Sequence, residues 1–249
     1  MLESKENNDA VIFHIGRCGS TLLSNILGQH PIVECRGEIF NPLMKIKLRG
    51  EPIPSIDNVL LNLRKKKNSP IQIFELKFLN DQHLSLYKLE INQFIEIVVN
   101  NGFNRFIVLE RKNYLRRMIS HCISQQTSIY HLKANQTAVL VRIKIDLQNI
   151  KVGIATRSLI EWMDIFSKSY ENIRLILSNY SFCDITYENE LLNDITLGYN
   201  KVCKYLNIIP DKISITTKRT NPFSLKEILI NYNEVERHLH NTIYEWMLY

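Results

Sequence analysis

The sequence predicts an α/β fold with three layers, in which a central parallel sheet is flanked by helices. Stretches of helical periodicity alternate with apolar, strand-like runs near 10–15, 71–78, 105–110 and 183–187. Strands separated by helices pair in parallel and are covered on both faces. The chain has 249 residues, 45% of them hydrophobic, which is enough for one substantial core. We therefore expect a single domain over residues 10–249, after a polar and disordered start over residues 1–9.

The first strand-like run leads through a basic glycine turn into a helix. Gly16 and Gly19 bracket the turn and Arg17 lies within it, followed by Leu22, Leu23, Ile26 and Leu27 at helical spacing. The free N–H groups of a helix start, the helix dipole and the Arg17 guanidinium all favour an anion here. Only two residues separate the glycines and no lysine precedes Ser20, so the turn is not a Walker A loop. The alternative is a glycine turn that binds nothing.

Cys18 lies in the same turn. A cysteine phosphatase would follow its cysteine with a short loop that ends in arginine, whereas this chain runs straight into an apolar helix. A reactive thiol also needs an electropositive pocket and a nearby base. We interpret Cys18 as a small loop residue and not as a nucleophile.

A second strand–helix junction follows about ninety residues later. The run 105–110 ends at Arg111, and a helix follows with apolar residues at 115, 118, 119, 122 and 123. On that helix Ser120 shares a side with Asn113 and Arg117. An arginine fork and a hydroxyl near the carboxyl ends of the strands suit a phosphate monoester. A solvated basic helix start is the alternative interpretation.

Together the two junctions resemble the nucleotide-binding pair of the sulfotransferases that use 3′-phosphoadenosine 5′-phosphosulfate (PAPS). The closest branch is the bacterial trehalose-type and nodulation-type group, which modifies carbohydrates and small molecules. The resemblance implies a P-loop-like fold. It also implies that Arg17, Cys18, Gly19, Ser20 and Thr21 hold the 5′-phosphosulfate, and that Arg111 and Ser120 hold the 3′-phosphate. Arg17 stands where the cytosolic branch of the family has a lysine.

Two later segments extend the resemblance over nearly the whole chain. The run 184–192 is similar to the late strand and Tyr-Glu turn of the family, which assigns Tyr187 to the cofactor site. The tail is similar to the family's closing basic loop and terminal helix. The resemblance assigns Lys218, Arg219 and Thr220 of that loop to cofactor binding.

The implied reaction is transfer of a sulfuryl group from PAPS to a hydroxyl or amine of a small-molecule or sugar acceptor, with PAP as the product. Such a transfer needs a base for the acceptor proton, an in-line approach and positive charge at the leaving phosphate. Arg17 supplies the charge. For the base we favour Glu38, because residues 34–42 resemble the Gly-x-x-Glu-x-Phe region that carries the catalytic glutamate of trehalose-type enzymes. A surface Glu38 paired with Arg36 is the alternative.

Two other residues compete for the role of base. Glu34 lies in the same loop, and Lys77 stands at the end of the strand 71–78, where a snorkelling edge lysine is equally consistent with the sequence. His14 lies inside the first strand and is interpreted as a packed core histidine. His83 and His121 are interpreted as solvated or hydrogen-bonded structural residues.

Composition narrows the compartment and the partners. The five cysteines form no CxxC pair, and the chain shows neither a signal peptide nor a long apolar span, which favours a cytoplasmic protein with no structural metal and no membrane span. The net charge of +6 is scattered and lacks an aromatic-basic platform, so a nucleic-acid partner is disfavoured. Thr137 to Ile150 alternates apolar and polar residues and predicts an inserted ribbon or a lid.

Two other functions stay open. One is a protein that binds 3′,5′-adenosine phosphates without turnover. The other is a small-molecule kinase, which is less favoured because no acidic motif for Mg²⁺ follows the strands. The sequence selects neither an acceptor nor an oligomeric state.

Overall fold

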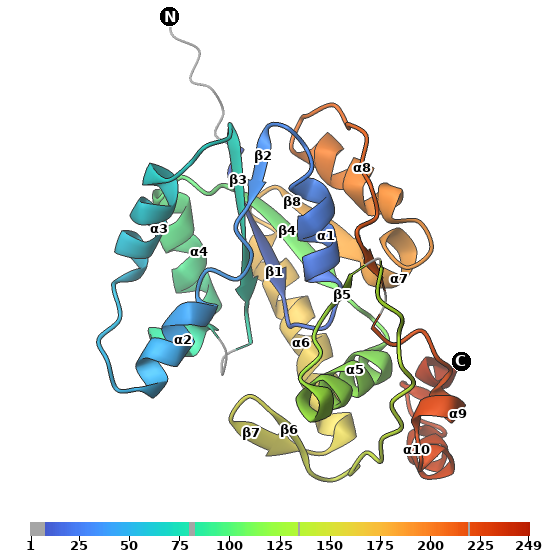
Figure 1. Ribbon diagram of the computed structural model, residues 1–249. Coiled ribbons are helices and arrows are strands. Elements are labelled where there is room, and N and C mark those ends of the chain that lie inside the picture. Colours follow the sequence, from blue (N-terminus) through green and yellow to red (C-terminus); the bar gives the residue numbers. More distant parts are fainter. Residues whose placement is uncertain (1–7, 80–82, 134, 219) are drawn as a thin grey trace, which may run out of the picture. The chain divides into compact units, whose positions relative to one another are not determined.

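The computed structural model describes residues 8–79, 83–133, 135–218 and 220–249 (Figure 1). The contacts divide the chain into two compact units. The first unit comprises Met1–Glu110 and Ser169–Ile213, and the second comprises Arg111–Lys168 and Ser214–Tyr249.

The first unit is built on a parallel sheet with five strands among its described residues, in the order β2-β3-β1-β4-β8. The strands are β1 (Ala10–His14), β2 (Val33–Cys35), β3 (Ile71–Lys77), β4 (Arg105–Glu110) and β8 (Phe182–Thr186). The predicted α/β class and its four strands are thus confirmed. β2 has only three residues, too few to show a periodicity. The register sets His14 beside Lys77, so that the carboxyl ends of β1 and β3 meet.

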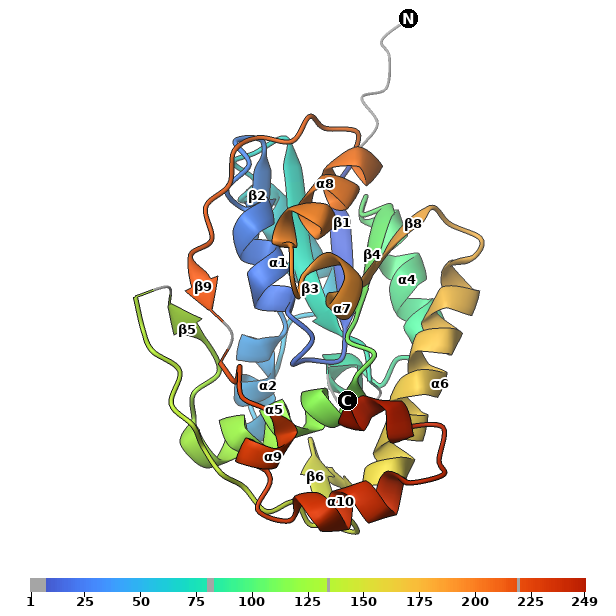
Figure 2. The same ribbon diagram turned by 90° about the vertical axis from the view of Figure 1, so that its right-hand side faces the viewer.

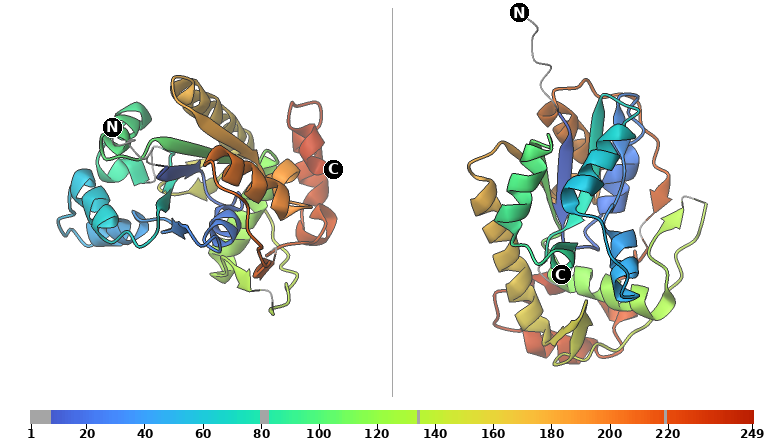
Figure 3. Two further views of the ribbon diagram at one scale, coloured as in Figure 1. Left: turned by 90° about the horizontal axis from the view of Figure 1, so that it is seen from above. Right: turned by 90° about the vertical axis from the view of Figure 1, so that its left-hand side faces the viewer.

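Helices cover both faces of this sheet. They are α1 (Ser20–Leu27), α2 (Asn41–Leu48), α3 (Ile56–Lys65), α4 (Ile91–Asn100), the end of α6 (Leu159–Leu177), α7 (Tyr187–Glu190) and α8 (Ile195–Tyr205), with a 3₁₀ turn η1 (His83–Leu86). α1 and α8 pack together on one face, where their apolar residues bury the even-numbered side of β1 (Figure 2). α3 and α4 lie on the opposite face (Figure 3). There Phe74 of β3 packs edge-on against Phe103.

The segment expected to be disordered is anchored at its end. Asp9 is fully buried, and its carboxylate accepts hydrogen bonds from Lys67 Nζ at 2.7 Å and from the Gln72 N–H at 2.7 Å. The side-chain amide of Asn8 donates to the Leu206 carbonyl at 3.1 Å. A buried carboxylate needs such partners. These contacts fix the chain at Asn8 and Asp9, immediately before β1 begins at Ala10. Residues 1–7 lie outside the described residues.

The second unit is mainly helical. Its elements are α5 (Tyr114–Thr127), β5 (Leu132–Lys133), β6 (Ile150–Val152), β7 (Ala155–Arg157), the start of α6 (Leu159–Leu177), β9 (Thr217–Lys218), α9 (Leu225–Ile228), α10 (Tyr232–Leu239) and a 3₁₀ turn η2 (Glu245–Leu248). β5 pairs with β9 and β6 with β7, both antiparallel.

The predicted ribbon over 137–150 is wrong in position. The hairpin is formed by β6 and β7, and the segment before them is extended without pairing to itself among the described residues. Ile143 instead makes a parallel bridge to Leu229, while Ile143 and Ile145 are buried and Val139 is exposed. The alternation in the sequence therefore reflects an extended segment packed on the C-terminal part of its own unit.

In the described part of the chain, no helix has both the length and the apolar character that a bilayer crossing requires.

Candidate functional site

The glycine turn at the carboxyl end of β1 has an unusual backbone. Gly16, Arg17 and Gly19 all have positive φ, at 81°, 58° and 92°. A Cβ at Gly19 would lie 2.7 Å from Cδ2 of Tyr187, the first residue of α7, so glycine is required there by both conformation and space. Tyr187 therefore closes one side of the turn, by packing on it.

The turn ends at the start of α1. No described side chain caps this helix, whose N-cap residue is Gly19. The amide groups of the first turn are consequently available as donors, and the helix dipole adds positive potential. Arg17 and Thr21 are half-buried there. This arrangement suits an anion, as the sequence predicts.

The Ser20 hydroxyl points inward instead. Ser24 Oγ donates to Glu75 Oε1 at 2.5 Å, and the Ser20 hydroxyl, one turn earlier on α1, bonds to the same carboxylate. The contribution of Ser20 to an anion site is therefore limited to its backbone N–H.

Glu75 also contacts His14, and both side chains are buried. Nε2 of His14 lies 3.2 Å from Glu75 Oε2, while Nδ1 accepts the Gly16 N–H at 3.0 Å. Burial favours the uncharged form of Glu75, but the His14 imidazole and the two serine hydroxyls outweigh it and lower the pKa of Glu75 to about 2.

For His14 burial lowers the pKa, and the neighbouring Cys18 thiol and Glu75 carboxylate outweigh that effect and raise it. Nδ1 accepts the Gly16 N–H in the neutral ring, so protonation of His14 to the imidazolium, which the raised pKa favours, must break that hydrogen bond. We therefore place the imidazole proton nearest Glu75 on Nε2. The structure confirms that His14 is buried, as its interpretation as a packed histidine requires. That interpretation missed its partner Glu75, because Glu75 lies on another strand and the sequence around His14 does not indicate it.

Glu38 lies beside this pair. The loop that carries it is fixed by β3, since the Glu75 N–H donates to the Gly37 carbonyl at 2.8 Å. Its carboxylate is 20% exposed and holds Lys77 Nζ at 2.6 Å through Oε2, whereas Oε1 lies 3.9 Å from His14 Nε2. The side-chain amide of Asn41 donates to the same Oε2. Glu38 is thus a partly exposed carboxylate in a cluster of basic groups.

The alternative interpretations of this loop are not what the structure shows. Arg36 pairs with Glu34 at 2.7 Å and donates to the Lys66 carbonyl at 2.6 Å, instead of pairing with Glu38. Glu34 also accepts from the amide of Gln72, at the amino end of β3. Glu34 therefore lies five strand positions away from Lys77 along β3 and is not a member of the cluster.

Lys77 bridges the cluster and the glycine turn. Its Cε would lie 3.5 Å from a Cβ at Gly16, and its side chain is 26% exposed. β2 pairs with β3 only over Ile71–Ile73, so the argument against a snorkelling edge lysine is the ion pair of Lys77 with Glu38. The structure therefore brings together Arg17's turn, Glu38 and Lys77 within the first unit.

His14, Glu38 and Glu75 also form a potential metal-ligand group. One ligand-type atom from each lies within 4.8 Å of the others. However, Lys77 already neutralises Glu38, and Ser24 together with His14 compensates Glu75. The chain's own cation and donors satisfy these carboxylates, so the donor set does not call for an ion.

The residues assigned to the 3′-phosphate lie in the second unit. Asn113 caps α5 by accepting the Arg116 N–H at 2.8 Å. Asn113, Arg117 and Ser120 share a side of α5 as expected, and all three are buried, with the Arg117 guanidinium 4.3 Å from the centre of the Phe166 ring. Arg111 immediately precedes this helix and is half-buried.

The basic loop of the tail is described only in part. Thr220 is half-buried, Lys218 belongs to β9, and Arg219 and the side chain of Lys218 lie outside the described residues. His121 has its Nε2 3.0 Å from the Lys151 carbonyl, in agreement with a structural role.

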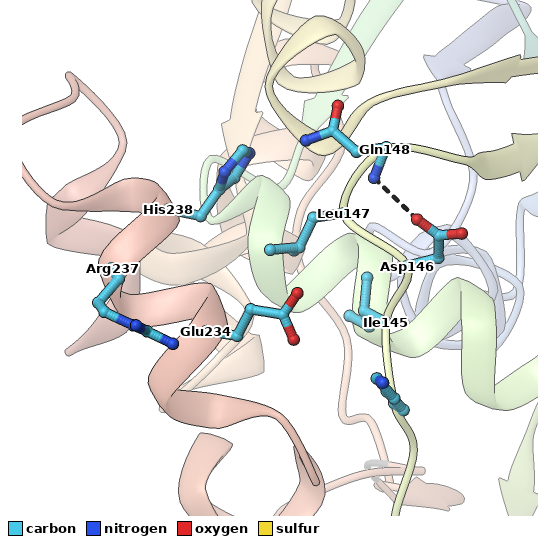
Figure 4. Close-up of a pocket in the computed structure, with 8 residues that line it drawn as sticks. Ile145, Asp146, Leu147, Gln148, Glu234, Arg237 and His238 are labelled. Atoms are coloured by element: carbon cyan, nitrogen blue, oxygen red, sulfur yellow. Dashed lines mark hydrogen bonds between the residues drawn. The ribbon is translucent and has the colours of Figure 1, made fainter.

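The second unit also contains a pocket between α10 and the extended segment before β6 (Figure 4). Its lining mixes Glu234, Arg237 and His238 with residues 144–148. Asp146, the acid among residues 144–148, accepts hydrogen bonds from the backbone N–H groups of Gln148 and Asn149 within the same turn. The lining carries charges of both signs and the imidazole of His238, whose Nε2 is buried, and we do not assign chemistry to the pocket.

No protein-family model matches the chain, and the comparison with curated proteins finds no significant relative.

Proposed function

We propose that the chain is a PAPS-dependent sulfotransferase that acts on a hydroxyl or amine of a small-molecule or sugar acceptor. The observation that carries the proposal is the Glu38–Lys77 ion pair of 2.6 Å beside the glycine turn. A carboxylate for the acceptor proton and a cation for the leaving phosphate are the two charges that the reaction requires.

The two oxygens of Glu38 have different surroundings. Lys77 and Asn41 engage Oε2, which leaves Oε1 as the oxygen to accept the proton from the acceptor. PAPS supplies the sulfuryl group, whose bond to the bridging phosphate oxygen breaks as the bond to the acceptor oxygen or nitrogen forms. The electron pair of the broken bond leaves with the phosphate of PAP. In-line transfer of this kind needs no covalent enzyme intermediate.

The positive charge that forms the other half of the site comes from three sources. The uncapped amides of α1, the Arg17 guanidinium and the Lys77 ammonium all favour negative charge on the phosphate that leaves. The glycines of the turn allow a close approach of the backbone to that phosphate. Binding of the 3′-phosphate by Arg111 and Ser120 rests on the sequence resemblance.

The first experiment is calorimetry with PAP, followed by a sulfate-transfer screen from PAPS over sugars and amines. We expect PAP to bind and at least one acceptor class to be sulfated. Glu38→Gln should lower transfer by about 10² or more, the usual contribution of a general base, and leave PAP affinity within about twofold. Glu51→Gln is the matched control, because this exposed acid pairs only with the surface residue Arg49 among the described side chains.

Each outcome has a defined meaning. PAP binding without transfer to any acceptor favours a non-catalytic nucleotide-binding protein. A chain that does not bind PAP at millimolar concentration contradicts the proposal. Full activity of Glu38→Gln contradicts the assignment of the base, and Lys77→Met then tests the remaining candidate.

A further inference from the structure

A hydrogen-bonded chain of side chains runs from β3 to Glu38. The Lys77 N–H donates to Nδ1 of His83 at 3.1 Å, and Nε2 of His83 lies 2.9 Å from Oδ1 of Asn41. The amide nitrogen of Asn41 then donates to Glu38 Oε2. The Lys77 ammonium reaches the same oxygen, so the connections form a closed ring that starts and ends at Lys77.

The protonation of His83 gives the chain a direction. Because Nδ1 accepts the backbone N–H, the ring proton must be on Nε2, which makes His83 a donor to Asn41. Asn41 Oδ1 is therefore the acceptor, and its NH₂ group must face Glu38. Burial, then the Lys77 and His14 charges, lowers the pKa of His83 to about 3, so the imidazole stays neutral near pH 7.

The surroundings hold the histidine in place. His83 is 2% exposed, and the Phe40 ring centre lies 5.9 Å from its own. Asn41 is exposed, but its backbone N–H donates to the Glu38 carbonyl at 3.2 Å, which ties the two residues together. A buried, neutral histidine thus fixes which end of this surface amide faces the carboxylate.

We propose that His83 and Asn41 are positioning residues that hold Glu38 with Oε2 engaged and Oε1 directed to the acceptor. This inference rests on the proposed function. It assigns a role to two residues that touch no reacting atom, and it explains why a histidine and an asparagine 42 positions apart meet at this point of the fold.

The activity arm of the test uses Asn41→Asp. This change keeps the acceptor for His83 and replaces the donor to Glu38 by a like charge. We expect turnover to fall by about tenfold or more, with the Kd for PAP and the Tm nearly unchanged. His83→Gln, which retains an amide donor, should keep more activity than His83→Leu. Asn58→Asp on α3 is the matched control, because it makes the same chemical change on an exposed helix surface.

The second arm does not require activity. The ¹⁵N shifts of the His83 ring in the wild-type protein should show a neutral imidazole with its proton on Nε2 from about pH 5 to pH 8, and Asn41→Leu should alter them. A charged ring or a proton on Nδ1 at pH 6 would overturn the relay, and so would unchanged turnover in Asn41→Asp. If the wild type sulfates nothing while the ring has the expected form, the proposed function fails and the hydrogen-bonded chain stands as a structural feature only.

Discussion

Replacement of Glu75 by glutamine tests the buried ion pair beneath the candidate base. The substitution keeps the shape of the side chain and an oxygen for Ser24, but removes the charge that faces His14 at 3.2 Å. At an effective dielectric constant of about 20, two unit charges at that separation attract by about 5 kcal/mol. Desolvation offsets part of this attraction, and loss of one partner from a buried pair costs about 3–5 kcal/mol. We expect Glu75→Gln to lower the free energy of unfolding by about 4 kcal/mol at pH 5.5.

The pH dependence follows from the directions of the two pKa shifts. The pKa of Glu75 is lowered in the folded protein, so its contribution is complete above the unfolded value of 4.5 and is lost as the pH falls through its folded value of about 2. The pKa of His14 is raised, so its contribution is complete below the unfolded value of 6.5 and is lost as the pH rises towards its folded value. The cost of Glu75→Gln is therefore largest between pH 4.5 and 6.5.

The assay is urea unfolding followed by far-UV circular dichroism at pH 5.5, 7.0 and 8.5. The loss in stability should shrink by about 1.4 kcal/mol per pH unit above 6.5, to about 1 kcal/mol at pH 8.5. Ser24→Ala removes one hydroxyl and neither charge, and should cost about 1 kcal/mol at every pH. Glu51→Gln breaks an exposed pair and should cost less than about 0.5 kcal/mol. A cost for Glu75→Gln that stays constant or grows with pH would show that His14 is not an imidazolium at pH 5.5 and that its Nδ1 keeps the Gly16 N–H.

Three further predictions concern the glycine turn and the sheet. Gly19→Ala should lower stability by about 2 kcal/mol or more, seen as a lower Tm, because the added methyl group meets Tyr187 in a left-handed conformation; an unchanged Tm would mean that α7 yields at no cost. Arg17→Ala should reduce both PAP affinity, measured by calorimetry, and turnover in the transfer assay. Arg17→Lys should have a smaller effect, since it keeps the charge but loses the fork; equal losses in the two variants would contradict a role for the charge alone. Arg174→Met should lower the free energy of unfolding by about 1–2 kcal/mol, because Glu110 and Asp184, which Arg174 contacts at 2.6 and 2.8 Å, both lose their cation. An unchanged midpoint of urea unfolding would contradict this.

The fold was accessible from the sequence wherever periodicity carried the information. β1, β3 and β4 are apolar runs of five to seven residues followed by helical spacing, and the glycine turn lies where the sequence placed it. The three residues of β2 are too short for such a pattern. The segment 137–150 shows the converse, since its alternation was real but its partners lie elsewhere in the chain.

The candidate site was only partly accessible for a related reason. Residues of the turn are adjacent in the chain, and Glu38 was found through its similarity to a known motif. The pairing of Glu38 with Lys77 depends on how the loop after β2 lies against β3, where the Glu75 N–H donates to the Gly37 carbonyl, and no local pattern encodes this. His83 reaches the site only because the 3₁₀ turn after β3 folds back on Asn41. Polar residues at the ends of neighbouring strands are the signal that could have suggested the cluster.

The left-handed conformation of Arg17 sets stability against the proposed binding of an anion at a single position. A non-glycine residue at φ 58° carries about 1 kcal/mol of backbone strain that glycine would relieve. Laboratory selection for heat resistance alone should therefore enrich Arg17→Gly and erase the guanidinium in the same step. A screen for a more thermostable variant of this protein therefore needs to select for ligand binding as well as for thermal stability.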